Sequence, residues 1–521
     1  MSETSSLLTD PLKFRSIYWP GSVLADYQLE IIQSVQRNKI TVCVAGNKLG
    51  KDHVAGFLAL WFFCSRVPSR VVCSSVDGSQ LQGVLFGEIR NLVQTSAFPL
   101  PVQVNHLHLR QMMPDGTRHG LSELIGRVVS KGEGLLGRHL PYGPDMEPRV
   151  LAIVDEASGF DDENYMGIDT WSHRILIIGN AFPCDNFFKR FVRGGDVVSD
   201  SPFLDYDVKI IKVPCIRSPN IRLSMEEERL GKPLSRRIII PGCIDIDDYL
   251  YRRKTYDPIK AAAGLDAEFY EGEEVRMFPQ EWLRISQDNG DELEKTDLKQ
   301  RTDRRTMGID TAEGGDDTVW TVVDKLGVIE QISQKTRNTA MIKGRTIALM
   351  KKHNIEEEDV LFDRGGGGRE HADYLREQGY DVQSVGFGEA PTAADQFEAG
   401  WTPGYERKDL SEEKYAYKNK RAQLYGTLRQ AIDPDRQLLG NHVFGIPRKY
   451  QELISQLEPI PLAYDGEGRM ILPPKDKPTD TYKGMTIKKM LGRSPDQSDS
   501  LVLAVFALVF VPEMVEVGGL K

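Results

Sequence analysis

The stretch that decides the fold is KITVCVAGNKLGKDHVAGFLALWFF, residues 39–63. Its apolar, β-branched residues 40–44 predict a buried strand, and the apolar residues after the turn predict a helix. The turn from Gly46 to Gly50 is typical of a phosphate-binding loop, in which backbone N–H groups and the positive helix end face a polyphosphate. Lys51 follows the second glycine, where a lysine can reach the outer phosphates. The stretch therefore predicts a nucleotide site between a strand and a helix.

This loop departs from the usual G-x-x-x-x-G-K-[ST] pattern at two positions. Ala45 occupies the place of the first glycine, and Asp52 stands where Ser or Thr would hold Mg²⁺. An aspartate can bind a hard cation directly or through water, so we expect Asp52 to belong to the magnesium shell. An ordinary glycine turn between a strand and a helix is the alternative interpretation of this motif taken alone.

Two later strands are expected to bring further groups to the same site. PRVLAIVDEASGF, residues 148–160, predicts a buried strand that ends in Asp155 and Glu156. We assign Asp155 to the Mg²⁺ shell and Glu156 to the activation of the water that attacks the γ-phosphate. RILIIGNAFP, residues 174–183, predicts a strand that ends at Asn180, where a polar side chain can sense the γ-phosphate. A turn or helix cap is the plain alternative for Asp155, and a simple strand exit is the alternative for Asn180.

Two further residues complete the expected ATP site. Gln28 lies in a helical stretch before the phosphate strand, and its carboxamide matches the N6 and N7 pattern of an adenine edge. Arg138, in the glycine-rich residues 126–141, is a candidate arginine finger for the charge of the transferred phosphoryl group. A solvent-facing helical glutamine and a surface arginine in a flexible loop are the respective alternatives. The alternation of strands and helices in this half predicts a parallel sheet with right-handed crossovers.

Composition sets the broad class of the protein. The 521 residues suffice for three to four units at about 150 residues each, and 40% hydrophobic with 27% charged residues is typical of a soluble globular protein. The net charge of −10 argues against a basic surface overall, although a local basic groove can still bind nucleic acid. The polar N-terminus lacks a secretory signal, and the apolar residues 501–511 are too short to span a bilayer. We therefore expect a cytoplasmic protein. Six cysteines without a C-x-x-C pair predict buried free thiols and not metal ligands.

The pattern changes in the middle of the chain. Residues 213–299 break into short pieces with the turns SPN, GKP and YDP and the charged run DNGDELEKTDLK. We interpret them as a lid or linker subdomain that ends an ATPase domain of residues 1–298. A second domain, residues 299–521, opens with strands expected at 307–310, 319–323 and 328–332, joined as an antiparallel meander.

Three aspartates of this second domain fall on separate elements. Asp310 lies on the first strand, Asp363 ends the strand in VLFDRGGGG, and Asp499 lies near the start of an apolar helix. A carboxylate on a central strand is costly to bury unless it is paired or binds a cation. Carboxylates on two strands and a helix suit a two-metal phosphodiester hydrolase, so we expect these three to bind metal and to catalyse cleavage. Three neighbouring acids are expected to have structural roles in preference to metal contact. Asp496 would stabilise the helix dipole, and Asp316 and Asp317 would be turn residues.

The order of these motifs resembles that of the large terminase subunit of tailed bacteriophages over nearly the whole chain. The resemblance rests on YQ, GNKLGKD, VDGSQLQGVLFGEIRNL, VDEAS, IIGN, GIDTAEGGDD, LFDRGGGG, KNKRAQLY and SPDQSDSLVLA. It implies an α/β protein with a RecA-like P-loop ATPase domain that moves duplex DNA and an RNase H-like nuclease domain that cuts it. Many relatives carry an arginine where Asn47 and Lys48 stand, so Lys48 is expected to take part of the phosphate contact.

The same resemblance implies cofactors and partners. ATP is the expected substrate, with Mg²⁺ in the ATPase site and Mg²⁺ or Mn²⁺ in the nuclease site. The expected partners are double-stranded DNA, a portal protein, a small terminase subunit and further copies in a ring, in the host cytoplasm at the procapsid portal vertex and without a membrane.

DNA contacts are expected mainly at phosphates, so binding should be sensitive to salt and indifferent to sequence. A solvated basic face is the alternative for each candidate residue. The candidates are Lys418, Lys420, Arg421, Lys475, Lys477 and Lys483.

Two other functional classes stay open. A helicase-nuclease of DNA repair or restriction would also join an ATPase to a nuclease, but it needs a second RecA-like domain with its own arginine motif, and none is found. A DNA-binding packaging protein with a degenerate ATPase would follow if Ala45 and Asp52 abolish ATP turnover.

Overall fold

The structure is a computed structural model that describes residues 9–129, 139–234, 236–272, 274–301, 304–312, 317–336, 338–392, 416–479, 482 and 484–509. The chain forms two units, Met1–Gly272 with Gly466–Gly468 and Glu273–Asp465 with Arg469–Lys521. The second unit thus begins at Glu273, whereas the sequence pattern predicts its start at residue 299. The reason is α12 (Gln280–Glu294), which binds residues of the second unit: Ser286 Oγ donates to the Phe444 carbonyl at 2.6 Å, and Asn289 Nδ2 donates to the Val443 carbonyl at 2.9 Å.

The first unit is built on a sheet of nine strands in the order β3-β4-β5-β2-β6-β7-β1-β9-β8. The central strands from β5 to β9 are parallel, whereas β3, β4 and β8 pair antiparallel at the edges. The phosphate strand β1 is separated from β6 by β7 alone, so one sheet edge receives the three predicted ATP-site segments. The strands are β1 (Ile40–Ala45), β2 (Arg70–Ser75), β3 (Val102–Asn105), β4 (His108–Met112), β5 (Arg118–Val128), β6 (Val150–Val154), β7 (Arg174–Gly179), β8 (Val197–Val198) and β9 (Tyr206–Val213).

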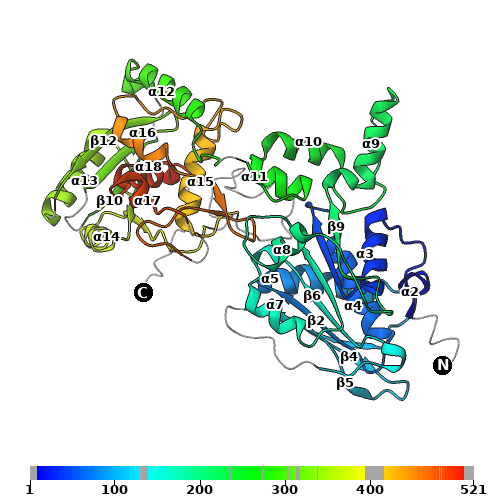
Figure 1. Ribbon diagram of the computed structural model, residues 1–521. Helices are drawn as coiled ribbons and strands as arrows, with labels where there is room; N and C mark the ends of the chain where they lie inside the picture. Colours follow the sequence, from blue (N-terminus) through cyan, green and yellow to red (C-terminus); the bar gives the residue numbers. More distant parts are fainter. Residues whose placement is uncertain are drawn as a thin grey trace, which may run out of the picture. The chain divides into compact units, whose positions relative to one another are not determined.

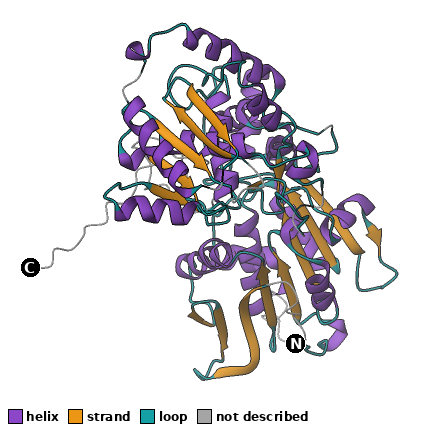
Figure 2. Ribbon diagram, turned by 90° about the vertical axis from the view of Figure 1, so that its left-hand side faces the viewer, coloured by secondary structure: helices purple, strands orange, loops and turns teal. Residues whose placement is uncertain are grey.

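Helices flank this sheet, as Figure 2 shows. The helix after the phosphate loop, α4, is apolar on all sides, and its residues from Val54 to Phe63 are buried. A π-helical turn, Leu81–Leu85, links α5 to α6. The helices are α2 (Pro11–Tyr18), α3 (Asp26–Arg37), α4 (Lys51–Cys64), α5 (Gly78–Gln80), α6 (Phe86–Thr95), α7 (Asp162–Asp169), α8 (Phe187–Gly194), α9 (Pro219–Arg229), α10 (Ile246–Thr255) and α11 (Pro258–Ala261).

The second unit contains a five-stranded sheet in the order β12-β11-β10-β13-β14. Its first three strands form the predicted antiparallel meander, and β13 and β14 then add in parallel to β10. The strands are β10 (Thr306–Asp310), β11 (Thr318–Val323), β12 (Val328–Gln334), β13 (Val360–Asp363) and β14 (Gln383–Val385), with a separate pair β15 (Ala463–Tyr464) and β16 (Met470–Ile471). The helices are α12, α13 (Thr339–His353), α14 (Gly368–Glu377), α15 (Lys420–Ile432), α16 (Gln451–Leu457), α17 (Ile487–Leu491) and α18 (Asp496–Ala507). The predicted α/β class, with a mostly parallel sheet in the first unit and a second sheet in the other, is confirmed.

The C-terminal helix α18 lies directly on β10, and both are seen together in Figure 1. All of its residues are buried. Gly308 in β10 permits this approach, because an added Cβ would lie 2.2 Å from the Ser500 carbonyl oxygen and 2.4 Å from the Ala504 nitrogen. Thr306 Oγ1 also donates to the Ala504 carbonyl at 2.6 Å. This packing brings the first turn of α18 to the carboxyl end of β10.

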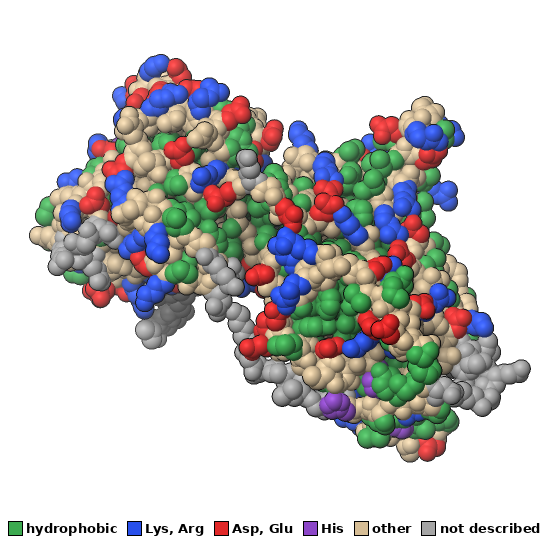
Figure 3. All heavy atoms as spheres, viewed as in Figure 1, with side chains coloured by type: hydrophobic (Ala, Val, Ile, Leu, Met, Phe, Trp, Pro, Cys, Tyr) green, Lys and Arg blue, Asp and Glu red, His purple; other side chains and the backbone are tan. Residues whose placement is uncertain are grey.

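Charged side chains of both signs are interspersed on the face shown in Figure 3, in keeping with the moderate net charge. The six cysteines are free thiols, as predicted, and four of them are buried. Within the described part of the chain, no helix combines the length and the apolar character needed to cross a membrane.

Candidate functional site

The loop between β1 and α4 holds most of the expected nucleotide-binding residues. Lys48 and Gly50 have left-handed φ angles of 54° and 68°. Gly50 adopts this conformation at little cost, whereas a lysine does so only when its surroundings hold it there. α4 begins at Lys51 and has Asp52 in its first turn. The loop therefore presents a helix N-terminus at the carboxyl edge of a parallel sheet, which is a favourable place for phosphate.

Asn180 connects the predicted phosphate lysine to the loop backbone. β7 lies beside β1, with Val44 paired to Gly179, so Asn180 emerges next to the loop. Lys51 Nζ donates to Asn180 Oδ1 at 2.7 Å. Asn180 Nδ2 in turn donates to the Ala45 carbonyl at 2.8 Å and to Asn47 Oδ1 at 3.1 Å. The residue expected to sense the γ-phosphate thus contacts the residue expected to bind it.

The two expected acids of the ATP site follow β6 at the same sheet edge. Asp155 donates its backbone N–H to the Ser74 carbonyl at 2.8 Å, and its Oδ1 accepts from the Glu156 N–H at 2.8 Å. Both acids are buried, and Glu156 has a left-handed φ of 52°. The turn that begins at Glu156 passes close to Gly179, where an added Cβ would lie 3.0 Å from the Ala157 nitrogen. A strained non-glycine residue at such a position is typical of functional sites.

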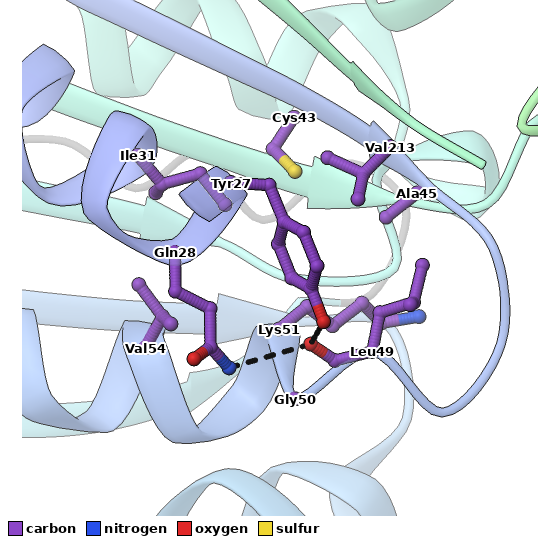
Figure 4. Close-up of a pocket in the computed structure, with 10 residues that line it drawn as sticks. All are labelled: Tyr27, Gln28, Ile31, Cys43, Ala45, Leu49, Gly50, Lys51, Val54 and Val213. Carbon is purple, nitrogen blue, oxygen red and sulfur yellow. Dashed lines mark hydrogen bonds between the residues drawn. The ribbon is translucent and has the colours of Figure 1, made fainter. Parts of the chain in front are cut away.

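Gln28 braces the loop against α3. Figure 4 shows Tyr27 and Gln28 extending from α3 towards Leu49, whose carbonyl accepts from Tyr27 Oη at 3.0 Å and from Gln28 Nε2 at 3.4 Å. The other end of the Gln28 amide, Oε1, accepts from the Ala25 N–H at 3.0 Å. Gln28 is buried, and both faces of its amide bind the protein itself. Recognition of adenine by Gln28 therefore stays a prediction, while its support of the loop is directly visible.

Segments far along the chain contact the loop from the predicted lid region of the first unit. The Asn47 N–H donates to the Gly264 carbonyl at 2.7 Å, and the Gly46 N–H donates to the Val213 carbonyl at 2.9 Å. Lys48 Nζ lies 3.4 Å from Asp248 Oδ2 on α10. Sequence reasoning missed Gly264 and Asp248, because no local pattern relates residues that are some 200 positions apart.

The predicted arginine finger, Arg138, and the acid Asp316 lie outside the described residues. The same holds for Lys483 among the proposed DNA contacts.

In the second unit, the three predicted metal-binding aspartates form one buried cluster. β10 and β13 are parallel neighbours with Ile309 paired to Phe362, so Asp310 and Asp363 follow side by side at their ends. Asp499 lies in the first turn of α18, and the exposed fractions of Asp310, Asp363 and Asp499 are 4%, 8% and 0%. Burial and the charge of Asp499 raise the pKa of Asp310 well above its ordinary value. Burial and the same charge raise the pKa of Asp363 to about 6.

Two cations balance part of this negative charge. Arg421 Nη2 on α15 lies 3.3 Å from Asp499 Oδ1, and Lys475 Nζ lies 3.3 Å from Asp499 Oδ2. Asp499 Oδ1 also accepts from Tyr425 Oη at 2.7 Å. Among the residues that the structure describes, no three Asp, Glu, His or Cys side chains stand in a geometry ready to hold a metal ion together. The donor set nevertheless suits Mg²⁺ or Mn²⁺, because crowded carboxylates are hard oxygen ligands that already attract cationic side chains.

Neighbouring acids have other partners. Asp496 Oδ2 accepts from the Asp317 N–H at 3.1 Å, and Asp317 Oδ2 accepts from Ser333 Oγ at 2.7 Å. These bonds join Asp317, directly before β11, to the start of α18 and to β12, which is the kind of structural role preferred for both acids.

The proposed DNA contacts need a correction. Lys420 and Arg421 are buried, with exposed fractions of 5% and 8%, and so cannot form a surface for DNA. Lys420 donates to Thr392 Oγ1, and burial lowers its pKa to about 8. Lys475 is half-buried against Asp499, while Lys418 and Lys477 are exposed. The basic motif KNKRAQLY led to a wrong prediction of exposure, because residues of other elements cover the start of α15.

Tyr425 is the functional candidate that sequence reasoning missed. It lies four positions after Arg421, so the two side chains share one face of α15 and meet at Asp499. That spacing within KNKRAQLY is the signal that could have indicated it.

Comparison with known proteins gives matches among solved structures only. No family model matches this chain, and no curated protein matches it. The large terminase of a thermophilic bacteriophage, solved in complex with ADP, is 10% identical with a TM-score of 0.49, and the match covers 92% of this chain and 98% of that chain. The large terminase ATPase domain of Thermus phage P74-26 is 19% identical with a TM-score of 0.34, covering 50% of this chain and 98% of that chain. The nuclease domain of the large terminase subunit gp2 of bacterial virus Sf6 is 17% identical with a TM-score of 0.34, covering 44% of this chain and 98% of that chain. Each of these three solved structures is a phage large terminase or one of its two domains.

Proposed function

We propose that this chain is a phage large terminase subunit that uses ATP to move double-stranded DNA into a procapsid and cuts concatemeric DNA. One observation carries the proposal: a single polypeptide holds a phosphate loop whose Lys51 contacts Asn180, and, in its other unit, a buried cluster of Asp310, Asp363 and Asp499. The first arrangement suits nucleotide hydrolysis, and the second suits cleavage of a phosphodiester.

In the ATPase reaction, Lys51 and the N-terminus of α4 would bind the outer phosphates of ATP. Asp155 and Asp52 would hold the magnesium ion that accompanies ATP. Glu156 would orient the attacking water and accept its proton. Asn180 would lose its bond to Lys51 when that lysine turns to the γ-phosphate, and it would thereby report nucleotide binding to the loop.

In the nuclease reaction, Asp310, Asp363 and Asp499 would hold divalent cations. Bound cations supply stabilisation of the attacking and leaving oxygens of the cleaved phosphodiester. The aspartates supply hard oxygen ligands from two strands and one helix, so their relative positions depend on the packing of α18 on β10. Burial of all three excludes bulk water from the ligand oxygens, which strengthens their electrostatic attraction for a cation.

The proposal includes partners that fit this pair of activities. A DNA motor of this kind would act as a homo-oligomeric ring at a portal protein, with a small terminase subunit, in the host cytoplasm. The exposed Lys418 and Lys477 would contribute phosphate contacts to DNA.

DNA-stimulated ATP turnover tests the motor. Lys51→Ala should lower turnover on the order of 100-fold, because the outer phosphates lose their cationic partner. Lys13→Ala removes an exposed lysine from the same unit and should leave turnover unchanged. Equal and negligible turnover in the unmodified protein and Lys51→Ala would instead favour a DNA-binding packaging protein with a degenerate ATPase.

A triplex-displacement assay separates a packaging motor from a helicase-nuclease. A duplex translocase should strip a third strand from linear DNA with ATP while the two duplex strands stay paired. ATP-dependent separation of those strands would favour the helicase-nuclease.

Plasmid nicking with Mn²⁺ or Mg²⁺ tests the nuclease. Asp363→Ala should abolish cleavage, as should a chelator, whereas Asp435→Ala removes an exposed acid of the same unit and should cleave normally. Undiminished cleavage by Asp363→Ala would contradict the assigned site.

A further inference from the structure

The two carboxylate oxygens of Asp499 have unequal surroundings. Oδ1 accepts from Tyr425 Oη at 2.7 Å and from Arg421 Nη2 at 3.3 Å, both on α15. Among the described residues, Oδ2 has one partner, Lys475 Nζ at 3.3 Å, from the segment between β16 and α17. One oxygen is therefore fixed by a helix, and the other faces a half-buried lysine outside any helix or strand.

Tyr425 is placed so that its hydroxyl serves Asp499. The side chain is fully buried, and α15 packs against α18, which carries Asp499. The hydroxyl also lies 2.8 Å from Ser498 Oγ, whose own proton is donated to the Pro495 carbonyl at 2.9 Å. Because Ser498 uses its proton in this way, it does not donate to Tyr425. The tyrosine proton goes to Asp499 Oδ1, which is the nearer and the charged acceptor. A buried tyrosine hydroxyl with a charged acceptor makes a strong hydrogen bond.

We propose that Tyr425 is a positioning residue of the nuclease, which locks the Asp499 carboxylate through Oδ1 so that Oδ2 is the oxygen offered to a divalent cation. Arg421 supports the same orientation from the preceding turn of α15. This inference rests on the proposed nuclease function. Neither residue would contact DNA or the reacting phosphate, and both would act through Asp499.

The test measures Mn²⁺ binding to the full chain in the absence of nucleotide. Electron paramagnetic resonance gives the concentration of free Mn²⁺ during the titration. Tyr425→Phe removes one hydroxyl and leaves the ring in place, so it should fold normally. Loss of a hydrogen bond that orients a metal ligand typically weakens affinity about 10- to 100-fold, and we expect Tyr425→Phe to weaken Mn²⁺ binding by that factor. The Mn²⁺ concentration for half-maximal plasmid nicking should rise by the same factor.

Tyr417→Phe is the matched control. Tyr417 is also buried in the second unit, and its hydroxyl accepts from Gln430 Nε2 at 3.1 Å. Removal of that hydroxyl should change thermal stability about as much as Tyr425→Phe and should leave Mn²⁺ affinity unchanged.

A double-mutant cycle shows whether Tyr425 acts through Asp499. In an Asp499→Asn background, Tyr425→Phe should weaken Mn²⁺ binding no further, because the carboxylate that it orients is gone. An undiminished additional effect in that background would overturn the positioning role.

Two other results are distinguishable. Normal Mn²⁺ binding by the unmodified protein, with Tyr425→Phe indistinguishable from Tyr417→Phe, would overturn this inference alone. Absence of Mn²⁺ binding and of cleavage in the unmodified protein would overturn the proposed nuclease and this inference with it.

Discussion

Asn180 accepts from Lys51 Nζ and donates to both Ala45 and Asn47, so one side chain holds three points of the phosphate loop. We expect Asn180→Ala to lower ATP turnover about 10- to 100-fold, since Lys51 loses the partner that directs it and the loop loses two bonds. Asn338→Ala removes a hydrogen-bonded helix-capping asparagine from the second unit and should leave turnover unchanged. Equal turnover in both variants would show that Asn180 has no part in the ATP site.

The protonation of His173 makes the free energy of unfolding depend on pH. Its ring stacks on Tyr142 at 3.7 Å, and its Nδ1 accepts from the Arg149 N–H at 2.9 Å, which requires an unprotonated nitrogen. Burial and then the charge of Arg174 lower its pKa from 6.5 to about 4. Between these pH values the unfolded state binds more protons, so the free energy of unfolding falls as pH drops from about 6.5 towards 4.

Comparison with His173→Gln isolates the contribution of this histidine to the pH dependence of stability. Between pH 7 and pH 5, the unmodified protein should lose about 1 kcal/mol more unfolding free energy than His173→Gln, after allowance for partial solvent screening. Urea unfolding at both pH values measures this difference. An identical pH dependence in the two proteins would contradict a neutral, buried His173.

At the scale of elements, the proposed nuclease cluster depends on how closely α18 approaches β10. Gly308→Ala would place a Cβ 2.2 Å from the Ser500 carbonyl oxygen, and backbone cannot yield as a flexible side chain does. We expect a loss of about 2–4 kcal/mol in unfolding free energy, together with loss of nicking, because the displaced helix carries Asp499 away from Asp310.

Gly344→Ala in α13 is the control for this change. Gly344 is exposed, and an added Cβ would meet nothing within 4 Å. In a helix interior this substitution should stabilise the protein by up to about 1 kcal/mol and leave nicking intact. Thermal unfolding and plasmid nicking are measured for both variants. A Gly308→Ala protein as stable and as active as the unmodified protein would contradict the close packing of α18 on β10.

Elements with a strong local pattern could be predicted from the sequence, whereas contacts between distant segments could not. The strand, turn and helix around Lys51 follow from apolar runs and glycines within 25 residues, and the structure has them with only slight changes in bounds. The meander after residue 304 followed equally from alternation and turns. Lys420 and Arg421 were misjudged because basic side chains usually face solvent, whereas nearly all of α15 is covered by its tertiary neighbours. Their burial depends on α18, some 75 residues away, and no local pattern contains that information.

At the scale of the whole molecule, the beginning of the second unit can be tested with fragments. Residues 273–521 include α12, whereas residues 299–521 lack it. Without α12, the Phe444 and Val443 carbonyls lose their donors, and the surface that covers Leu283 is exposed. We expect the shorter fragment to be less stable by at least about 3 kcal/mol, as judged by urea unfolding. Equal stability would favour the later boundary at residue 299.

We propose that one chain contains two chemically independent sites, an ATPase at Lys51 and a nuclease at Asp310, Asp363 and Asp499. The most direct measurement determines both activities, DNA-stimulated ATP turnover and Mn²⁺-dependent nicking, on the same preparations of Lys51→Ala and Asp363→Ala. We expect Lys51→Ala to nick plasmid normally while its ATP turnover falls on the order of 100-fold, and Asp363→Ala to turn over ATP normally without nicking. Loss of both activities in either well-folded variant, or nicking by Asp363→Ala at the unmodified rate, would contradict it.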